Sequence, residues 1–487
     1  MTPSRTDACR RPSPHTRLRR LTLCLLACAV STGTAAVSVT AFGATTVSAR
    51  PASHWKATQA PLPGAAAADP GIGVRQLTCA AVGTCVGVAS FSDKSLIRSG
   101  VIEQLRGGRW RARTAPVPRG SSATADVTLT SVSCPNSRSC GVSGYLDTPA
   151  TRRPELLSLR RGSWTAQAAP LVRGTTAGSS TSLSSISCPR PGSCVAVGRY
   201  QGAHGYFQGL IEVQSGPRWR AVKAPVPADT ARNPFGGVDW VTCPRAGRCI
   251  TVGAYVDRRG RRELFADVLA GGTWRSTRLP LPAHPARNPI AYLGYVTCRS
   301  PVECLAVGNF VTSLGATEGL FEREISGVWH ATRAPVPPRA PANPLATINE
   351  ASCPTISFCA ATGDYQDRAG DGQGLLETFS KGTWSAVSAP APAGDRTDRF
   401  MSTVSCPIAR WCVAAGSTDI SALLETYARG RWKVTVAPLP APGLHALFQS
   451  TSVSCPSTQM CAAFGAFTKD HGTMPQGQGL LETYRPR

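Results

Sequence analysis

Histidine is scarce in this chain. There are seven histidines in 487 residues, and none recurs at a fixed place in the repeating unit described below. A structural zinc site is usually built from cysteine and histidine ligands at short, fixed spacings. The cysteines here form isolated Cys-x5-Cys pairs, with no second pair and no histidine at ligand spacing. The sequence therefore predicts no metal site and no cofactor.

Motifs of several catalytic classes are also absent. The chain has no Ser-His-Asp order, no nucleophile elbow and no phosphate-binding loop, which argues against the enzyme classes that these motifs identify. Its basic residues are not interleaved with aromatic residues in the manner that stacks nucleic-acid bases. We therefore expect no specific nucleic acid among its partners.

What the chain does contain is one unit of about 55 residues, present eight times without linkers. Each unit has a β-rich segment ending in cysteine, an apolar segment ending in glycine, a variable loop, a Leu-Leu-Glu-like segment and Gly-x-Trp, with proline six residues after the tryptophan. The tryptophans are Trp55, Trp110, Trp164, Trp219, Trp274, Trp329, Trp384 and Trp432. A fixed period of this length with four short strands per unit is typical of a β-propeller.

The eighth unit is divided between the two ends of the chain. Residues 455–484 lack their tryptophan strand, and a matching strand, residues 54–63, stands before the first unit. In a closed ring this N-terminal strand completes the last blade and removes free sheet edges, whereas an open solenoid needs polar caps instead. The sequence thus predicts an all-β fold, a single eight-bladed β-propeller domain over residues 50–487 with four strands per blade, closed by the N-terminal strand.

Residues 1–49 have the pattern of a signal peptide. Arg17, Arg19 and Arg20 precede an apolar stretch that begins at Leu21, and small residues lead up to a cleavage site after Ala49. Cleavage there predicts a secreted protein, extracellular or associated with the cell wall, with no integral membrane span. The alternative is retention as a membrane anchor, because residues 21–44 are long enough to cross a bilayer.

Sixteen of the 19 cysteines lie beyond this segment and form pairs of identical spacing. A strictly paired, even number of cysteines behind an export signal implies disulfides, each of which would cross-link the first two strands of a blade. The predicted pairs are Cys79–Cys85, Cys134–Cys140, Cys188–Cys194, Cys243–Cys249, Cys298–Cys304, Cys353–Cys359, Cys406–Cys412 and Cys455–Cys461.

Residues 185–200, with Ser-Cys-Pro and Cys-Val-Ala-Val-Gly, resemble secreted repeat proteins of actinobacteria that carry SCxxxxxCVAVG and GxxW…P units. The likeness extends over about residues 54–484. It implies export and a propeller fold, and it brings no established activity. A weaker likeness is to the Asp-box of sialidase-type propellers, at residues 271–274 and 381–384, where the serine and aspartate of the box are absent. That likeness implies only a hairpin between the third and fourth strands.

An acidic residue stands seven positions before the tryptophan in most units, and Leu157 replaces it in the second. Active sites are singular, so we interpret this repeated acid as a structural partner of backbone or arginine. The series is Glu103, Glu212, Asp267, Glu322, Glu377 and Glu425, with Glu482 equivalent in the divided unit.

Function is expected where the repeat breaks. The loops between second and third strands and the connections between blades carry the variation and share one face, the predicted binding surface. Three residues before the first cysteine, small or polar residues give way to Trp240, Tyr295 and Glu350 in adjacent blades. Aromatic rings and a carboxylate at a channel mouth suit a sugar or a cation; the alternative is that they plug the channel. The other members of the series are Gln76, Ser131, Ser185, Thr403 and Ser452.

Arginines add to this predicted binding face. They are Arg232 and Arg287, each beside an Asn-Pro turn, and Arg258, Arg259, Arg261 and Arg262 in one loop. The net charge of +24 should draw the protein to anionic surfaces. Arginine, however, supplies 46 of the 52 basic residues, so GC-rich coding would give the same excess.

The sequence thus predicts a secreted, non-enzymatic propeller that binds a glycan, an anionic cell-wall polymer or an extracellular protein through its variable-loop face. One alternative is a sialidase-like glycoside hydrolase or lyase. A glycosidase needs two singular carboxylates, and Glu350 stands alone because Asp239 is expected on the other side of its strand. Another alternative is a structural component of an extracellular assembly.

Overall fold

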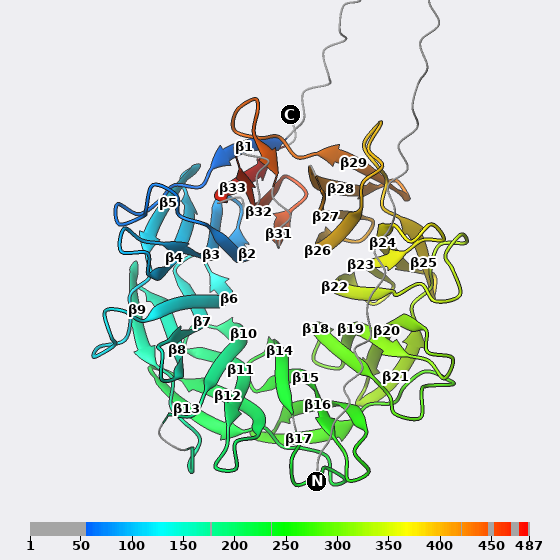
Figure 1. Ribbon diagram of the computed structural model, residues 1–487, viewed down its shortest axis with the longest axis horizontal. Coiled ribbons are helices and arrows are strands. Elements are labelled where there is room, and N and C mark those ends of the chain that lie inside the picture. The colour runs from blue at the N-terminus through cyan, green and yellow to red at the C-terminus, as the bar shows by residue number, and fades with distance from the viewer. Residues whose placement is uncertain are drawn as a thin grey trace, which may run out of the picture. The chain divides into compact units, whose positions relative to one another are not determined.

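The computed structural model describes residues 55–175, 178–234, 236–419, 421–446, 452–468 and 477–485. In these residues all regular structure is β-strand, arranged as eight antiparallel sheets around a ring (Figure 1). The predicted all-β, eight-bladed propeller is therefore confirmed. No membrane-spanning helix occurs in the described part of the chain. The predicted signal peptide, residues 1–49, lies outside the described residues, and its boundary stays a prediction.

Each blade has four strands, counted from the centre of the ring outward. In blades 1 to 4 they are β2 (Gly73–Ala81), β3 (Thr84–Ser92), β4 (Arg98–Arg106), β5 (Arg109–Thr114); β6 (Asp126–Asn136), β7 (Ser139–Asp147), β8 (Arg152–Arg160), β9 (Ser163–Ala168); β10 (Thr181–Arg190), β11 (Ser193–Gln201), β12 (Phe207–Ser215), β13 (Arg218–Lys223); and β14 (Gly237–Arg245), β15 (Arg248–Val256), β16 (Arg262–Ala270), β17 (Thr273–Arg278).

The second half of the ring repeats this order. Blades 5 to 8 contain β18 (Ala291–Ser300), β19 (Glu303–Val311), β20 (Thr317–Ile325), β21 (Val328–Arg333); β22 (Thr347–Thr355), β23 (Phe358–Gln366), β24 (Gly372–Ser380), β25 (Thr383–Ser388); β26 (Arg399–Ile408), β27 (Trp411–Thr418), β28 (Ala422–Ala428), β29 (Arg431–Val436); and β31 (Ser452–Ser457), β32 (Met460–Thr468), β33 (Gln478–Tyr484), β1 (Trp55–Gln59). A two-residue strand, β30 (His445–Ala446), also pairs with β32.

The N-terminal strand closes the ring, as the divided eighth unit predicts. β1 pairs antiparallel with β33, from Trp55 opposite Tyr484 to Gln59 opposite Leu480, and the two strands lie together at the junction of the ends in Figure 1. The amide of Ala60 continues the ladder by donating to the carbonyl of Gly479 at 2.7 Å. Blade 8 therefore gains its outer strand from the start of the chain.

The position of a strand within its blade determines which of its faces are buried. The second strands are buried on both faces, because a neighbouring blade covers each side; β15 shows this with seven consecutive buried residues. The fourth strands alternate and expose one face to solvent, as in β5. This difference explains why the apolar runs follow the second cysteine of each unit.

The repeated tryptophan joins neighbouring blades. Trp329 of blade 5 packs in one cluster with Ile250 and Ala266 of blade 4. Trp384 of blade 6 stacks on Phe321 of blade 5, with ring centroids 3.9 Å apart. Every blade thus places its tryptophan against the preceding blade of the ring, so that Trp110 of blade 1 packs against blade 8 and Trp55 of blade 8 packs against blade 7.

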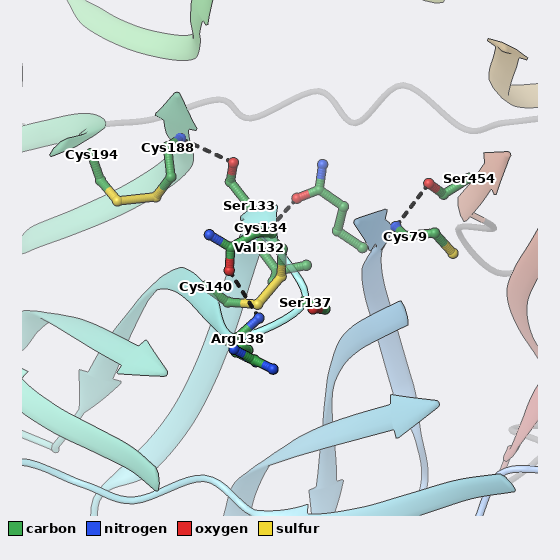
Figure 2. The surroundings of a disulfide bond; sticks show 12 residues. Cys79, Val132, Ser133, Cys134, Ser137, Arg138, Cys140, Cys188, Cys194 and Ser454 are labelled. Carbon is green, nitrogen blue, oxygen red and sulfur yellow. Dashed lines mark hydrogen bonds between the residues drawn. A yellow bond between two sulfur atoms is a disulfide. The ribbon is translucent and has the colours of Figure 1, made fainter. Parts of the chain in front are cut away.

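All eight predicted disulfides are present, each within the hairpin of the first two strands of one blade. Figure 2 shows the Cys134–Cys140 bond at the turn between β6 and β7. The glycine four residues after the second cysteine permits a close backbone approach, because a Cβ on Gly198 would overlap the carbonyl oxygen of Ser182. Cross-link and glycine therefore shape the same hairpin.

Candidate functional site

The inner strands are bonded to one another by side chains. The serine before the first cysteine accepts a hydrogen bond from the amide of the next blade's cysteine: Ser133 from Cys188 at 3.0 Å, and Ser454 from Cys79 at 3.0 Å (Figure 2). Serines 187, 352 and 405 do the same. These amides lie on a strand with no strand neighbour on one side. The hydroxyls therefore satisfy an edge that would otherwise be unpaired.

The channel series forms a second ring of such bonds. The amides of the next inner strand donate to Ser131, Ser452 and Gln76 over 2.8–3.2 Å. Glu350 takes the same role by accepting from the amide of Val404. This position is therefore an interblade contact in the blades where its side chain can accept. Trp240 and Tyr295 occupy the same position with aromatic rings.

The structure brings Trp240, Tyr295 and Glu350 together in one row across β14, β18 and β22. The rings of Trp240 and Tyr295 lie 4.7 Å apart. The Tyr295 hydroxyl donates to the Glu350 carboxylate, as does Thr403. Desolvation raises the pKa of Glu350 to about 8, although its hydrogen bonds act in the opposite direction. The carboxylate thus has protein partners, and ligand binding by this row stays a prediction.

Tyr295→Phe tests whether this row acts as scaffold. The substitution keeps the ring against Trp240 but removes one donor from Glu350 in a poorly solvated place. We expect unfolding to become easier by about 1–3 kcal/mol, measured by chemical denaturation at pH 7. Unchanged stability combined with lost binding of a sugar would instead support the ligand role.

Asp239 departs from the strand alternation expected for it. The register of β14 with β15 shifts between Val238 and Trp240, so Asp239 is the extra residue of a β-bulge, where alternation with period two does not hold. Burial raises its pKa, while Arg262 and Arg199 act to lower it. Tyr292 of blade 5, 42% exposed, feels the charge of Asp239. Three blades therefore meet at this acid, beside Trp240.

The loop of four arginines is a tight turn held by Asp257. Asp257 accepts from the amides of Arg259 and Arg261 at 2.9 and 2.8 Å, and its carboxylate also binds the Arg261 guanidinium. Arg258 donates to the carbonyl of Ala228. Arg259 and Arg262 remain exposed. Asp93 and Asp367 hold the equivalent loops of blades 1 and 6 in the same way, a repeated turn that we did not predict.

A groove of about 640 Å³ lies between blades 4 and 5 and contains two of the predicted arginines. Arg261 and Arg287 line it together with Arg278 and Glu263. Glu263 is 1% exposed and lies 2.8 Å from Arg278 and 3.3 Å from Arg261. Arg287 is exposed and has no hydrogen-bond or ion-pair partner in the described part of the chain. The lining therefore carries more positive than negative charge.

This blade 4–5 groove and the aromatic row are separate places. The groove is formed by the third and fourth strands and the following connection, whereas the row lies on first strands, nearest the centre of the ring (Figure 1). Arg278 was not among the predicted site residues. Its signal is a basic residue four positions after the tryptophan in blades 3, 4 and 5, at Lys223, Arg278 and Arg333.

The repeated acids lie in the interfaces between blades. Glu322 stands opposite Ala306 and Ala331, on the face where Leu320 and Trp329 pack against blade 4. In blade 2 the acid has moved two residues along the same face, to Glu155, and Leu157 takes its place. All eight acids are at most 4% exposed. Each interface therefore contains one of these buried carboxyl groups.

Most of these carboxyl groups lack the hydrogen bond from backbone or arginine that was predicted for them. Several of them have no hydrogen bond to either carboxyl oxygen within the described residues; these include Glu155, Glu212, Glu322, Glu377 and Glu425. Burial raises the pKa of Glu155 to about 8 and that of Glu322 to about 9. For these five acids the expectation of a structural partner was wrong, because the residues opposite them on the neighbouring strands are glycine, alanine or valine and offer no side-chain donor. Within the described residues, no group of three or more histidine, cysteine or acidic side chains could hold a metal ion.

No protein-family model matches the chain, and no curated protein matches it. Solved structures that are similar include the Trypanosoma rangeli sialidase (11% identity, 88% of this chain and 58% of that one, TM-score 0.38), a Mycobacterium tuberculosis puromycin-hydrolyzing peptidase (12%, 85% and 62%, 0.43) and the Aleuria aurantia lectin (13%, 68% and 99%, 0.33). The chain spans less than two thirds of the first two structures. At these identities and scores, none of them carries a function over to this chain.

Proposed function

We propose that this protein is a secreted, non-enzymatic binding propeller that recognises an anionic glycan or cell-wall polymer on its variable-loop face. The observation that carries this proposal is the blade 4–5 groove, where Arg261 and Arg278 pair with one carboxylate and Arg287 adds an unpaired cation to the lining. The ligand chemistry is a linear polymer with carboxylate or phosphate groups.

The groove has the features of an anion site. Its three arginines come from the loop before β16, the end of β17 and the connection to blade 5, so the rigid blades fix their relative positions. Guanidinium groups bind carboxylate and phosphate through two parallel hydrogen bonds. Glu263 is held by two of the arginines, which leaves Arg287 as the free cation for a ligand. The net charge of +24 favours approach of a polyanion.

Binding is favoured over catalysis by the state of the acids. Glu263 is the carboxylate of the groove lining, and two ion pairs occupy it. The repeated acids are buried between blades, where a polymer cannot reach them. A glycosidase needs two carboxyl groups on either side of one accessible bond. This arrangement supplies no such pair in the groove.

Arg287→Ala tests the proposal directly. Residues 50–487 would be titrated with polygalacturonate and with polyglycerol phosphate, at low salt and at physiological salt. We expect the variant to bind the preferred polymer at least about tenfold more weakly, since a hydrogen bond to a charged group is worth about 1.5–3 kcal/mol. Added salt should reduce the difference in affinity between the variant and the intact protein, because salt screens exposed charges.

Arg218→Ala is the matched control. Arg218 is also exposed but lies at the hairpin of β12 and β13 and does not line the groove. Its removal takes away the same charge and should leave affinity unchanged. Equal losses in the two variants would mean that overall charge, and not the groove, governs binding. Failure of the intact protein to bind either polymer would overturn the proposal.

A further inference from the structure

A second basic groove, of about 260 Å³, lies between blades 3 and 4. Its lining includes Lys223 and Arg232. Lys223 stands four residues after Trp219, as Arg278 does after Trp274, and Arg232 precedes Arg287 by one repeat of 55 residues. The blade 3–4 groove therefore repeats the blade 4–5 groove with basic residues at the same positions.

The two free arginines are held by the same local structure. Both belong to the tetrapeptide Ala-Arg-Asn-Pro, at residues 231–234 and 286–289. The amide of Ala231 donates to the carbonyl of Val256 at 2.9 Å, and that of Ala286 donates to Val311 at 3.0 Å. Each connection is thus bonded to the second strand of the following blade just before its arginine. The ring consequently presents Arg232 and Arg287 in equivalent surroundings, one blade apart.

Neither arginine is used by the protein itself. Arg232 and Arg287 are exposed, and neither makes a hydrogen bond or an ion pair with any described residue. Arg261 and Arg278, by contrast, are paired with Glu263. The free arginines of the two grooves therefore lie on the two connections, and Lys223 at the end of β13 is a further exposed cation of the blade 3–4 groove.

The free arginine does not recur in the next connection, between blades 5 and 6. There the corresponding residues are Pro-Ala-Asn-Pro, and Ala342 replaces the arginine. The arginine–glutamate pair of the site is retained, because Arg333 pairs with Glu318 at 2.5 Å as Arg278 pairs with Glu263. Blade 5 thus has part of the scaffold of a third site without its free cation.

We propose that the blade 3–4 and blade 4–5 grooves are tandem subsites for one linear polyanion whose charges recur along the chain, an inference that rests on the proposed function. A short anion fills one groove. A longer chain that occupies one groove is held near the other, so its second contact forms at high effective concentration. Affinity therefore rises sharply once the polymer spans both arginines.

The experiment uses residues 50–487 and inorganic polyphosphate of defined lengths, with galacturonate oligomers as the carboxylate counterpart. Dissociation constants are measured against chain length for the intact protein, Arg232→Ala, Arg287→Ala, the double variant and the Arg218→Ala control. We expect each single variant to lose at least about tenfold in affinity for long chains and much less for short ones. The polymer class with the lower dissociation constant identifies the charged group that is recognised.

Ala342→Arg supplies a gain-of-function arm. Ala342 is exposed, so the longer side chain has room. Adding the missing cation should extend the array and tighten binding of the longest chains by about threefold or more, without changing the binding of short ones. Melting curves confirm that each variant is folded.

The outcomes separate this inference from the proposed function. If Arg287→Ala weakens binding while Arg232→Ala does not, and affinity is independent of chain length, the blade 4–5 groove acts alone and the tandem site is wrong. If no polyanion binds, the proposed function itself fails. Single-stranded DNA bound as tightly as the best polymer of equal charge would show attraction by charge alone, and it would overturn both.

Discussion

Raising the pH from 5 to 9 is expected to lower the melting temperature of this propeller by about 10 °C or more. The cause is the buried carboxyl group in each blade interface. The folded state raises the pKa of Glu103, Glu212, Glu425 and Glu482 to about 8 and that of Glu322 to about 9, from an ordinary 4.5. For most of these acids burial is the cause, with no charged group acting on them; Arg399 near Glu425 opposes the shift.

The direction follows from proton binding. Between pH 4.5 and about 8, the folded protein retains protons that the unfolded chain has released. Each increase in pH in this window therefore favours unfolding. Below this window the acids are protonated in both the folded and the unfolded state, and above about pH 9 they are ionised in both. Outside the window these acids therefore no longer make stability depend on pH. One unit of pKa difference is worth about 1.4 kcal/mol, so a few such acids are comparable with a total stability of about 5–15 kcal/mol.

Glu322→Gln and Glu377→Gln isolate the effect. Glutamine keeps the shape of the side chain but cannot ionise, so each variant should melt higher than the parent at pH 9 and nearly level with it at pH 5. Asp371→Asn, at an exposed acid, is the matched control and should not change the slope. Differential scanning calorimetry across the pH range provides the measurement. A melting temperature that is constant or rises from pH 5 to 9 would show that the acids ionise without cost.

Much of this fold could be predicted because its information is repeated. The cysteine spacing determines which hairpins are cross-linked, and the displaced tryptophan strand of residues 54–63 predicts the closure of the ring. The same periodicity made the repeated acid recognisable as scaffold. The periodicity did not reveal what surrounds the acid, because the burial of the acid depends on the blade that packs against it. In blade 2 the acid lies two residues earlier on the same face of the strand, at Glu155, and Leu157 occupies the expected position. The repeat pattern therefore did not identify this eighth acid.

The candidate site was only partly predictable for the same reason. Arg232 and Arg287 were recognisable from the Asn-Pro turns beside them. Their grooves were not, since each groove forms between elements distant in the repeat, and Glu263 and Arg278 become neighbours only when β16 pairs with β17. The period-two alternation assumed for Asp239 does not apply where a β-bulge interrupts β14. Local patterns thus identified the residues, whereas contacts between strands and blades determined their partners.

Deleting residues 50–63 is expected to open the ring. The deletion removes β1 and leaves the edge of β33 unpaired along five residues, from Leu480 to Tyr484. It also removes Trp55, which is 5% exposed and packs against Val413 and Ala415 of blade 7. Loss of a buried tryptophan alone costs about 3–5 kcal/mol, and an unpaired edge strand invites association with other chains. We expect lower thermal stability and aggregation in size-exclusion chromatography.

Trp55→Ala separates the two contributions, because it keeps the backbone ladder of β1 while removing the packing. This variant should lose stability but stay monomeric, whereas the deletion should lose both stability and the monomeric state. A synthetic peptide of residues 50–63 supplies the strand in trans and should restore the monomer, since β33 offers it the same hydrogen bonds that β1 makes. A truncated chain that stays monomeric and melts with the intact protein would show that β1 is not needed to close the ring. Rescue by the peptide, in contrast, requires that the eighth blade is built from both ends of the chain.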